Sequence, residues 1–136
     1  MQGQCLCGAV QVNAPKAREI GACHCQICRR WGGGPLLAVH AEPEDVSFSG
    51  TEHVAVYASS DWAERGFCRH CGTHLYYRLH ATGQWFIPAG LLEGEGLEIT
   101  GQIFIDSKPG YYALANQTPL YTGQEVLDMF AAAGTP

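Results

Sequence analysis

The chain has 136 residues, of which 46% are hydrophobic and 15% charged, so it has enough apolar surface to fold and too little charge to stay disordered. This is the size of one compact domain, and we expect a single domain over residues 1–136. The formal net charge is -5 and the eight lysines and arginines are scattered, which argues against nucleic acid or an anionic membrane as a partner.

The N-terminal residues are polar and contain two cysteines, unlike the basic start and apolar stretch of a signal peptide. No apolar run approaches the roughly 18 residues that a membrane-spanning helix needs. We therefore expect a cytoplasmic protein. Because thiols stay reduced in the cytosol, the seven cysteines are better explained by metal binding than by disulfides.

Short apolar or β-branched runs bounded by glycine predict strands along most of the chain. The predicted strands are residues 9–12, 35–40, 46–48, 53–57, 75–79, 84–88 and 98–105. Seventeen glycines can supply the turns between them. The pattern favours a mainly β fold of short antiparallel strands.

One short helix is predicted near the C-terminus. Thr122 can cap it, Glu125 follows at the capping-box position, and apolar residues recur at helical spacing up to Phe130. Gly134 would end the helix. We expect this helix to cover an open face or edge of the sheet.

Four of the cysteines form two knuckle-like pairs, each followed by a glycine that lets the backbone turn sharply. These cysteines are Cys5, Cys7, Cys68 and Cys71. Zinc binds four tetrahedral ligands, and cysteines one or two residues apart can enclose one side of such an ion. Two pairs complete one site, so we expect a structural zinc ion that ties the N-terminus to the middle of the chain.

The remaining cysteines, Cys23, Cys25 and Cys28, offer three ligands and no fourth cysteine. Three protein ligands leave one coordination position open, which separates catalytic from structural zinc. We therefore expect a second zinc ion here and assign these cysteines to catalysis. His24 could supply a fourth ligand, but alternate residues of an extended segment face opposite sides, which argues against it.

The other histidines receive no role, because His40, His53, His74 and His80 have strand-like surroundings and His70 lies inside a knuckle. Arg29 and Arg30 follow Cys28, where guanidinium groups could hold a carboxylate of a thiol ligand such as glutathione. Arg65 and Arg69 flank Cys68, and for all four arginines simple charge compensation or solvation is the alternative. Trp31 and the three glycines after it are expected to form a flexible loop beside the open site.

Taken together, the motifs resemble the glutathione-dependent formaldehyde-activating enzyme and centromere protein V family. The matching stretches are residues 3–10, 23–29, 65–73 and 103–109, and they span most of the chain. The resemblance implies a β-tent-like fold stapled by zinc. It also implies that Cys5, Cys7, Cys68 and Cys71 hold structural zinc and that Cys23, Cys25 and Cys28 hold catalytic zinc.

The activity that the resemblance implies is a carbon–sulfur lyase reaction, the interconversion of formaldehyde, glutathione and S-hydroxymethylglutathione. Its partners are then a small-molecule thiol and a small aldehyde. Two alternatives stay open: a non-catalytic zinc-binding module for protein interaction or assembly, and a redox sensor that uses the middle thiols.

Overall fold

The computed structural model describes residues 1–132, which form a mainly β structure with two α-helices. The smaller sheet contains β1 (Gln2–Gln4), β2 (Gln11–Asn13), β5 (Ser47–Ser49) and β10 (Leu92–Glu93). The larger sheet contains β3 (Glu19–Cys23), β4 (Leu36–Ala41), β6 (Val54–Tyr57), β7 (Ala63–Cys68), β8 (His74–Leu79), β9 (Trp85–Pro88), β11 (Glu98–Ile103) and β12 (Leu120–Tyr121). The helices are α1 (Gln26–Gly32) and α2 (Gly123–Ala132). Within these residues, neither helix has the length and hydrophobicity of a membrane-spanning segment.

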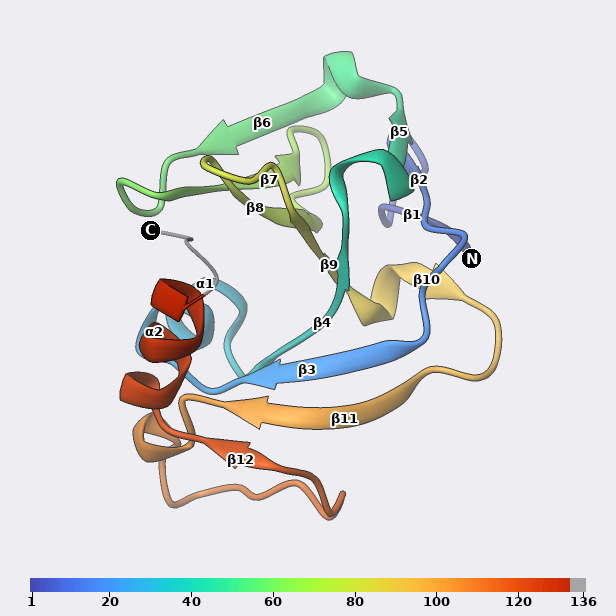
Figure 1. The fold of residues 1–136 in the computed structure, drawn as a ribbon. Coiled ribbons are helices and arrows are strands. Elements are labelled where there is room, and N and C mark those ends of the chain that lie inside the picture. Colours follow the sequence, from blue (N-terminus) through green and yellow to red (C-terminus); the bar gives the residue numbers. More distant parts are fainter. Residues whose placement is uncertain (133–136) are drawn as a thin grey trace.

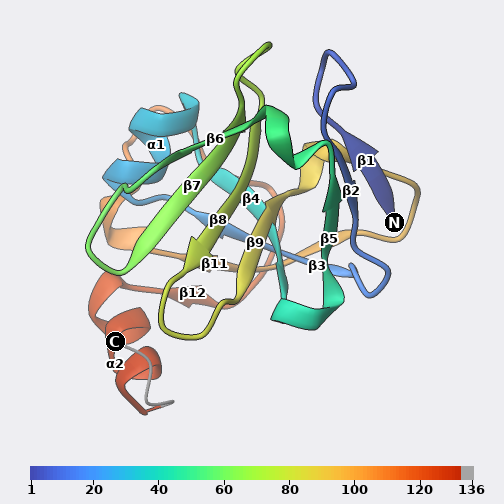
Figure 2. The ribbon, with the colours of Figure 1, turned by 90° about the horizontal axis from the view of Figure 1, so that it is seen from above.

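The larger sheet runs in the order β12-β11-β3-β4-β9-β8-β7-β6, and it bends so that its two ends form two layers. In Figure 1, β6, β7 and β8 lie in the upper layer, β3, β11 and β12 lie in the lower one, and β4 and β9 run between them. Figure 2 shows the upper strands lying over the lower ones, with the smaller sheet at the side of the N-terminus and both helices at the opposite side.

Most strand pairs are antiparallel, as expected, but the expectation is wrong for β11. This strand runs parallel to both of its neighbours, β3 and β12. A parallel pair needs a long connection. The connection from β3 to β11 contains all the strands from β4 to β10. Hydrophobic patterning within short segments does not reveal a pairing between strands so far apart in sequence.

The hydrophobic core lies between the smaller sheet and the larger one. Buried aliphatic side chains come from both sides, for example Val10 and Val12 at β2 and Leu75 and Ile87 from the larger sheet. Burial of one such side chain stabilises the fold by about 1.5–3 kcal/mol. Cys68 is fully buried in the same cluster, so part of the four-cysteine set borders the core.

The predicted strands all overlap observed ones, with small shifts at their ends, whereas β1, β3, β7, β10 and β12 were not predicted. The last predicted strand, 98–105, ends early because Phe104 adopts a left-handed backbone with φ 54°. The loop expected after Cys28 is wrong: Trp31 and Gly32 are the last residues of α1, and Gly33 ends the helix in a left-handed conformation.

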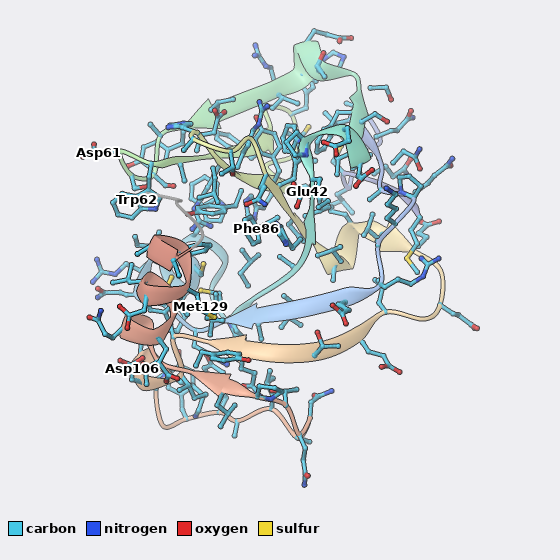
Figure 3. The ribbon with its side chains drawn as sticks, viewed as in Figure 1. Glu42, Asp61, Trp62, Phe86, Asp106 and Met129 are labelled. Atoms are coloured by element: carbon cyan, nitrogen blue, oxygen red, sulfur yellow. The ribbon has the colours of Figure 1, made fainter. Side chains whose placement is uncertain are left out.

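The predicted C-terminal helix and its cap are confirmed. Thr122 Oγ1 accepts a hydrogen bond from the Glu125 amide, and Glu125 Oε1 accepts one from the Thr122 amide, which is the reciprocal capping box. The Gly123 amide donates to Asp106 Oδ1 at 2.8 Å. This contact attaches the N-terminal end of α2 to the turn after β11. Figure 3 shows Asp106 beside this end of the helix. The predicted stop at Gly134 lies outside the described residues.

Candidate functional site

Four cysteine sulfurs converge beside the core. The Sγ atoms of Cys5, Cys7, Cys68 and Cys71 all lie within 4.8 Å of one another. The Cys5–Cys7 separation is 3.6 Å and the Cys7–Cys68 separation is 3.7 Å. A zinc tetrahedron with bonds of about 2.3 Å places its sulfurs about 3.8 Å apart. The cluster therefore has the shape and the donor set that a structural zinc ion requires.

Local backbone geometry explains why each pair forms. Gly8 and Gly72 have φ values of 82° and 78°, and each amide donates to the carbonyl three or four residues earlier, on Cys5 and Cys68. Side chains with a Cβ rarely adopt this conformation. Thr73 joins the two knuckles, because its Oγ1 accepts from the Leu6 amide at 3.1 Å and lies 3.1 Å from Cys71 Sγ. Hydrogen bonds from the Thr73 side chain and backbone lower the pKa of Cys71 to about 5.

The second cluster forms where β3 passes into α1. The Sγ atoms of Cys23, Cys25 and Cys28 lie within 4.8 Å of one another. Cys23 ends β3, Cys25 is the N-cap of α1, and Cys28 lies in the first turn, where its amide donates to Cys25 Sγ at 3.3 Å. Over residues 1–132, no histidine or carboxylate joins this group as a fourth ligand.

The electrostatics of this cluster favour a bound cation. Hydrogen bonds from Cys23 and Cys28 lower the pKa of Cys25 to about 2. The hydrogen bonds with Cys25 and Cys28 raise the pKa of Cys23, because Cys23 needs its proton in order to donate to Cys25. One thiolate is thus stabilised by two neighbouring thiols, and three thiolates at this separation repel one another unless a metal ion joins them.

His24 separates two of these cysteines but points away from them. It is fully buried, with Nε2 2.8 Å from Gln102 Oε1 and Nδ1 2.7 Å from the Tyr112 hydroxyl. Its amide donates to the Ile103 carbonyl. Both ring nitrogens therefore have protein partners, and His24 fixes the cysteine-bearing turn to β11 and to the loop that follows.

The arginines after Cys28 differ in their surroundings. Arg29 Nε donates to the His24 carbonyl at 3.0 Å and Arg29 Nη2 donates to the Ser107 carbonyl at 3.2 Å. These contacts brace the same turn from its other side. Arg30 is exposed and is the more accessible of the two.

Arg65 was placed by the sequence beside Cys68, but the structure places its side chain at the other cluster. Arg65 is 2% exposed, and its Nη2 donates to Cys28 Sγ at 3.5 Å. It lies in the middle of β7, a strand of the upper layer in Figure 1. Linear spacing from the cysteines could not reveal this contact, although Arg65 stood within a motif of the resemblance.

Aromatic rings lie on α1, on β6 and β8 of the upper layer, and on β9 and β4 between the layers. Trp31 stacks on Tyr57 with ring centroids 6.0 Å apart, Tyr77 packs against Phe86 at 5.5 Å, and Phe86 stacks on His40 at 4.9 Å. In Figure 3, Phe86 lies between the two layers and Trp62 lies at the turn before β7. Burial raises the pKa of Tyr77, and the neighbouring Cys28 and Cys23 raise it further, so this phenol stays protonated.

Two further histidines lie near the clusters without joining them. His74 contacts the Trp31 ring at 5.5 Å, and its Nε2 lies 2.9 Å from the Tyr76 carbonyl. Burial, together with the charge of Arg65, lowers the pKa of His74 to about 4, so it is neutral at physiological pH. His70 lies inside a knuckle but bonds to His53 at 2.8 Å.

Comparison with known proteins agrees with this geometry. A family model described as glutathione-dependent formaldehyde-activating enzyme matches residues 1–107. An uncharacterized lyase of Schizosaccharomyces pombe is 39% identical over 129 residues, which cover 93% of each chain. A candidate glutathione-dependent formaldehyde-activating enzyme of Podospora anserina is 31% identical over 103 residues, covering 68% of this chain and 48% of that protein.

Among solved structures, a crystal structure of a Rhodobacter sphaeroides protein is similar, with a TM-score of 0.57 and 29% sequence identity. The match covers 70% of this chain and 90% of that one. These findings confirm the fold expected from the cysteine motifs and, through the family, the expectation of an enzyme. The chain belongs to the glutathione-dependent formaldehyde-activating enzyme family.

Proposed function

We propose that this chain is a zinc-dependent enzyme of the carbon–sulfur lyase type that acts on the adduct of a thiol, such as glutathione, with a small aldehyde, such as formaldehyde. Cys23, Cys25 and Cys28 are the proposed catalytic ligands. Cys5, Cys7, Cys68 and Cys71 are the proposed structural ligands. Two ions, one in each cluster, are the proposed metal content.

The observation that carries the proposal is the contrast between the two clusters. Four sulfurs lie at tetrahedral spacing in one, and only three converge in the other, where the described residues supply no fourth ligand. Zinc sites with four protein ligands are structural, whereas three protein ligands leave a position for a reacting ligand. A zinc ion held by three thiolates would supply that position and would lower the pKa of a thiol that takes it.

The chain's own residues then have separate tasks. The three cysteines hold the metal, while His24 and Arg29 fix the turn that carries them. In the synthetic direction the thiol sulfur forms a bond to the aldehyde carbon, the carbon–oxygen π bond breaks, and the thiol proton ends on that oxygen. In the lyase direction the same bonds change in reverse. We assign Arg30 to a carboxylate of the thiol, because Arg29 already bonds to two carbonyl groups.

Exchange spectroscopy by nuclear magnetic resonance tests the activity directly. A mixture of glutathione and formaldehyde forms its adduct spontaneously, and magnetisation transfer between free and bound formaldehyde gives the rate of interconversion. The zinc-loaded protein should raise this rate, and metal analysis should find two zinc ions per chain. Cys25→Ser, which removes one proposed catalytic ligand, should abolish the acceleration.

The non-catalytic alternative predicts a different result. If the loaded protein at high concentration leaves the exchange rate at its spontaneous value, the enzyme proposal is wrong and the domain is a zinc-binding module. If acceleration occurs but persists in Cys25→Ser, the activity lies elsewhere than at the three-cysteine cluster. Cys71→Ser is a useful comparison, because it alters the other cluster by the same change of one sulfur to oxygen.

A further inference from the structure

Arg65 is a buried cation that has no carboxylate partner within residues 1–132. It is 2% exposed, and arginine is almost never fully buried unless it is paired. The ion pairs formed by the described residues involve Lys16, His53 and His80 instead. Since removing an isolated charge from water costs several kcal/mol, its burial calls for another source of negative charge.

The contacts of its guanidinium group identify that source. Nη2 donates to Cys28 Sγ at 3.5 Å, and Nε and Nη1 are buried with no hydrogen-bond partner among the described residues. The guanidinium carbon lies 4.8 Å from the ring centroid of Tyr77 and 5.9 Å from that of Trp31. These ring faces attract a cation, but they carry no net negative charge to balance it. Of the groups that Arg65 contacts, Cys28 is the one that becomes an anion when the cluster binds a metal.

The charges of the cluster give Arg65 a specific task. Three thiolates exceed a divalent cation by one negative charge, and an anionic fourth ligand would make the excess two. A neutral fourth ligand would leave it at one. A buried positive charge stabilises the cluster with an anionic fourth ligand more than the cluster with a neutral one. The effect is large because electrostatic interactions are stronger in a poorly hydrated position than in water.

We propose that Arg65 is the counter-charge of the three-cysteine cluster and that it makes this cluster prefer an anionic thiolate to a neutral ligand. This rests on the proposed function in one respect, namely that the cluster holds a metal ion. The preference depends on Arg65 because Arg29 bonds to backbone carbonyls and Arg30 is exposed to solvent. Arg65 is thus a residue that determines ligand specificity by its charge.

Cobalt(II) in place of zinc makes the proposal measurable without any assay of activity, because a change of ligand at cobalt changes its visible absorption. The protein is titrated at fixed pH with 2-mercaptoethanol, which binds as a thiolate, and separately with imidazole, which binds as a neutral molecule. The four-cysteine cluster has no free position, so the titratable change reports on the three-cysteine cluster.

Arg65→Met removes the charged guanidinium group and keeps an unbranched apolar side chain in place of the arginine stem. We expect it to weaken thiol binding by about 10-fold or more, in the range of outer-shell substitutions at metal sites. Imidazole binding should change by less than about 2-fold. Arg65→Lys, which keeps the charge, should retain most of the preference for thiol. If Arg65→Met does not fold, Arg65→Gln provides the same neutral comparison while keeping a donor for Cys28.

Arg78→Met is the matched control. Arg78 lies on the neighbouring strand β8, is half-buried, and stacks over the Trp85 ring at 4.3 Å, but it contacts neither cysteine cluster. Its loss should leave both titrations unchanged. Equal weakening of thiol and imidazole binding by Arg65→Met, or no weakening of either, would overturn the role of Arg65 alone. No ligand-dependent cobalt spectrum in the wild-type protein would overturn the proposed function and this inference together.

Discussion

Arg65 and Cys68 lie three residues apart on β7, yet each contacts a different cysteine cluster. Arg65 Nη2 donates to Cys28 Sγ at 3.5 Å, whereas Cys68 Sγ lies 3.7 Å from Cys7 Sγ. One short strand therefore connects the two candidate metal sites. A change that displaces β7 is expected to alter both of them.

Serine substitutions in the two clusters should have different consequences. Cys68→Ser should release the metal of the four-cysteine cluster and lower the melting temperature by about 10 °C or more, because that cluster cross-links distant parts of the chain as a disulfide would. Cys25→Ser should lose one equivalent of zinc and keep the fold. Metal analysis combined with thermal unfolding by circular dichroism checks both. Similar unfolding of the two variants would mean that both sites are structural.

His24→Ala should weaken metal binding without removing a ligand. The change leaves Gln102 and Tyr112 without their partner and frees the turn that carries Cys23 and Cys25. We expect a loss of about 2 kcal/mol or more in the free energy of unfolding. We also expect metal affinity at the three-cysteine cluster to fall by about 10–100-fold, measured by competition with a chelator.

The control for this prediction is Tyr112→Phe, which removes one of the two hydrogen bonds of His24 and should cost about 1 kcal/mol. At saturating zinc, His24→Ala should bind as many ions as the wild-type protein. A lower stoichiometry would show that His24 is itself a ligand.

The seven cysteines could be sorted from the sequence because short spacings dictate which sulfurs share a turn, and the structure brings together the same four and the same three. The strand β7 could not be predicted. Its sequence contains Glu64, Arg65 and Gly66, which are typical of exposed or irregular segments, yet it is an interior strand with Arg65 buried. The side chain that accepts a hydrogen bond from Arg65 is Cys28, which is remote in sequence.

The helix α1 was missed for a similar reason. Its N-cap is Cys25, a residue type that does not ordinarily cap helices, and it is only seven residues long. The strand β3 was missed because Gly21 and Ala22 give it little β propensity, and it is held instead by pairing with β4 and β11. In both elements tertiary contacts outweigh local preference.

The protonation of His74 predicts a pH dependence of stability. Its pKa is about 4 in the folded protein, below the ordinary histidine value of 6.5, so between these limits the unfolded chain binds a proton that the folded chain does not. Stability should be insensitive to His74 above about pH 6.5 and should fall as the pH drops towards 4. Urea unfolding of the wild type and of His74→Phe across this range measures the effect, since the variant lacks the titrating group.

Loss of metal in acid affects both proteins alike, so the prediction concerns the difference between their stabilities. The wild type should lose more stability than His74→Phe as the pH falls from neutral towards the lowered pKa of His74. Parallel curves would contradict the assignment of a lowered pKa to His74.

Gly66→Ala should destabilise β7 through a steric clash. A Cβ at this position would lie 2.1 Å from Cε2 of Tyr76, whose ring is packed in the core. Overpacking of this kind costs about 1–3 kcal/mol, read from chemical denaturation. Gly21→Ala is the matched control, because it lies in β3 and an added Cβ there meets no atom within 4 Å. Tyr76→Leu in the Gly66→Ala background should recover part of the loss, and equal effects of the two alanine substitutions would contradict the clash.

The parallel pairing of β3 with β11 also sets the order in which the chain can assemble during synthesis. Ile20 of β3 leaves the ribosome long before Ile99, its neighbour in β11. Until β11 has been synthesised, the edge of β3 that pairs with it has no hydrogen-bond partners. Unpaired edges are templates for association between chains. A chain truncated before Glu98 is therefore expected to aggregate as well as to lose activity, which light scattering of the freshly translated product would reveal.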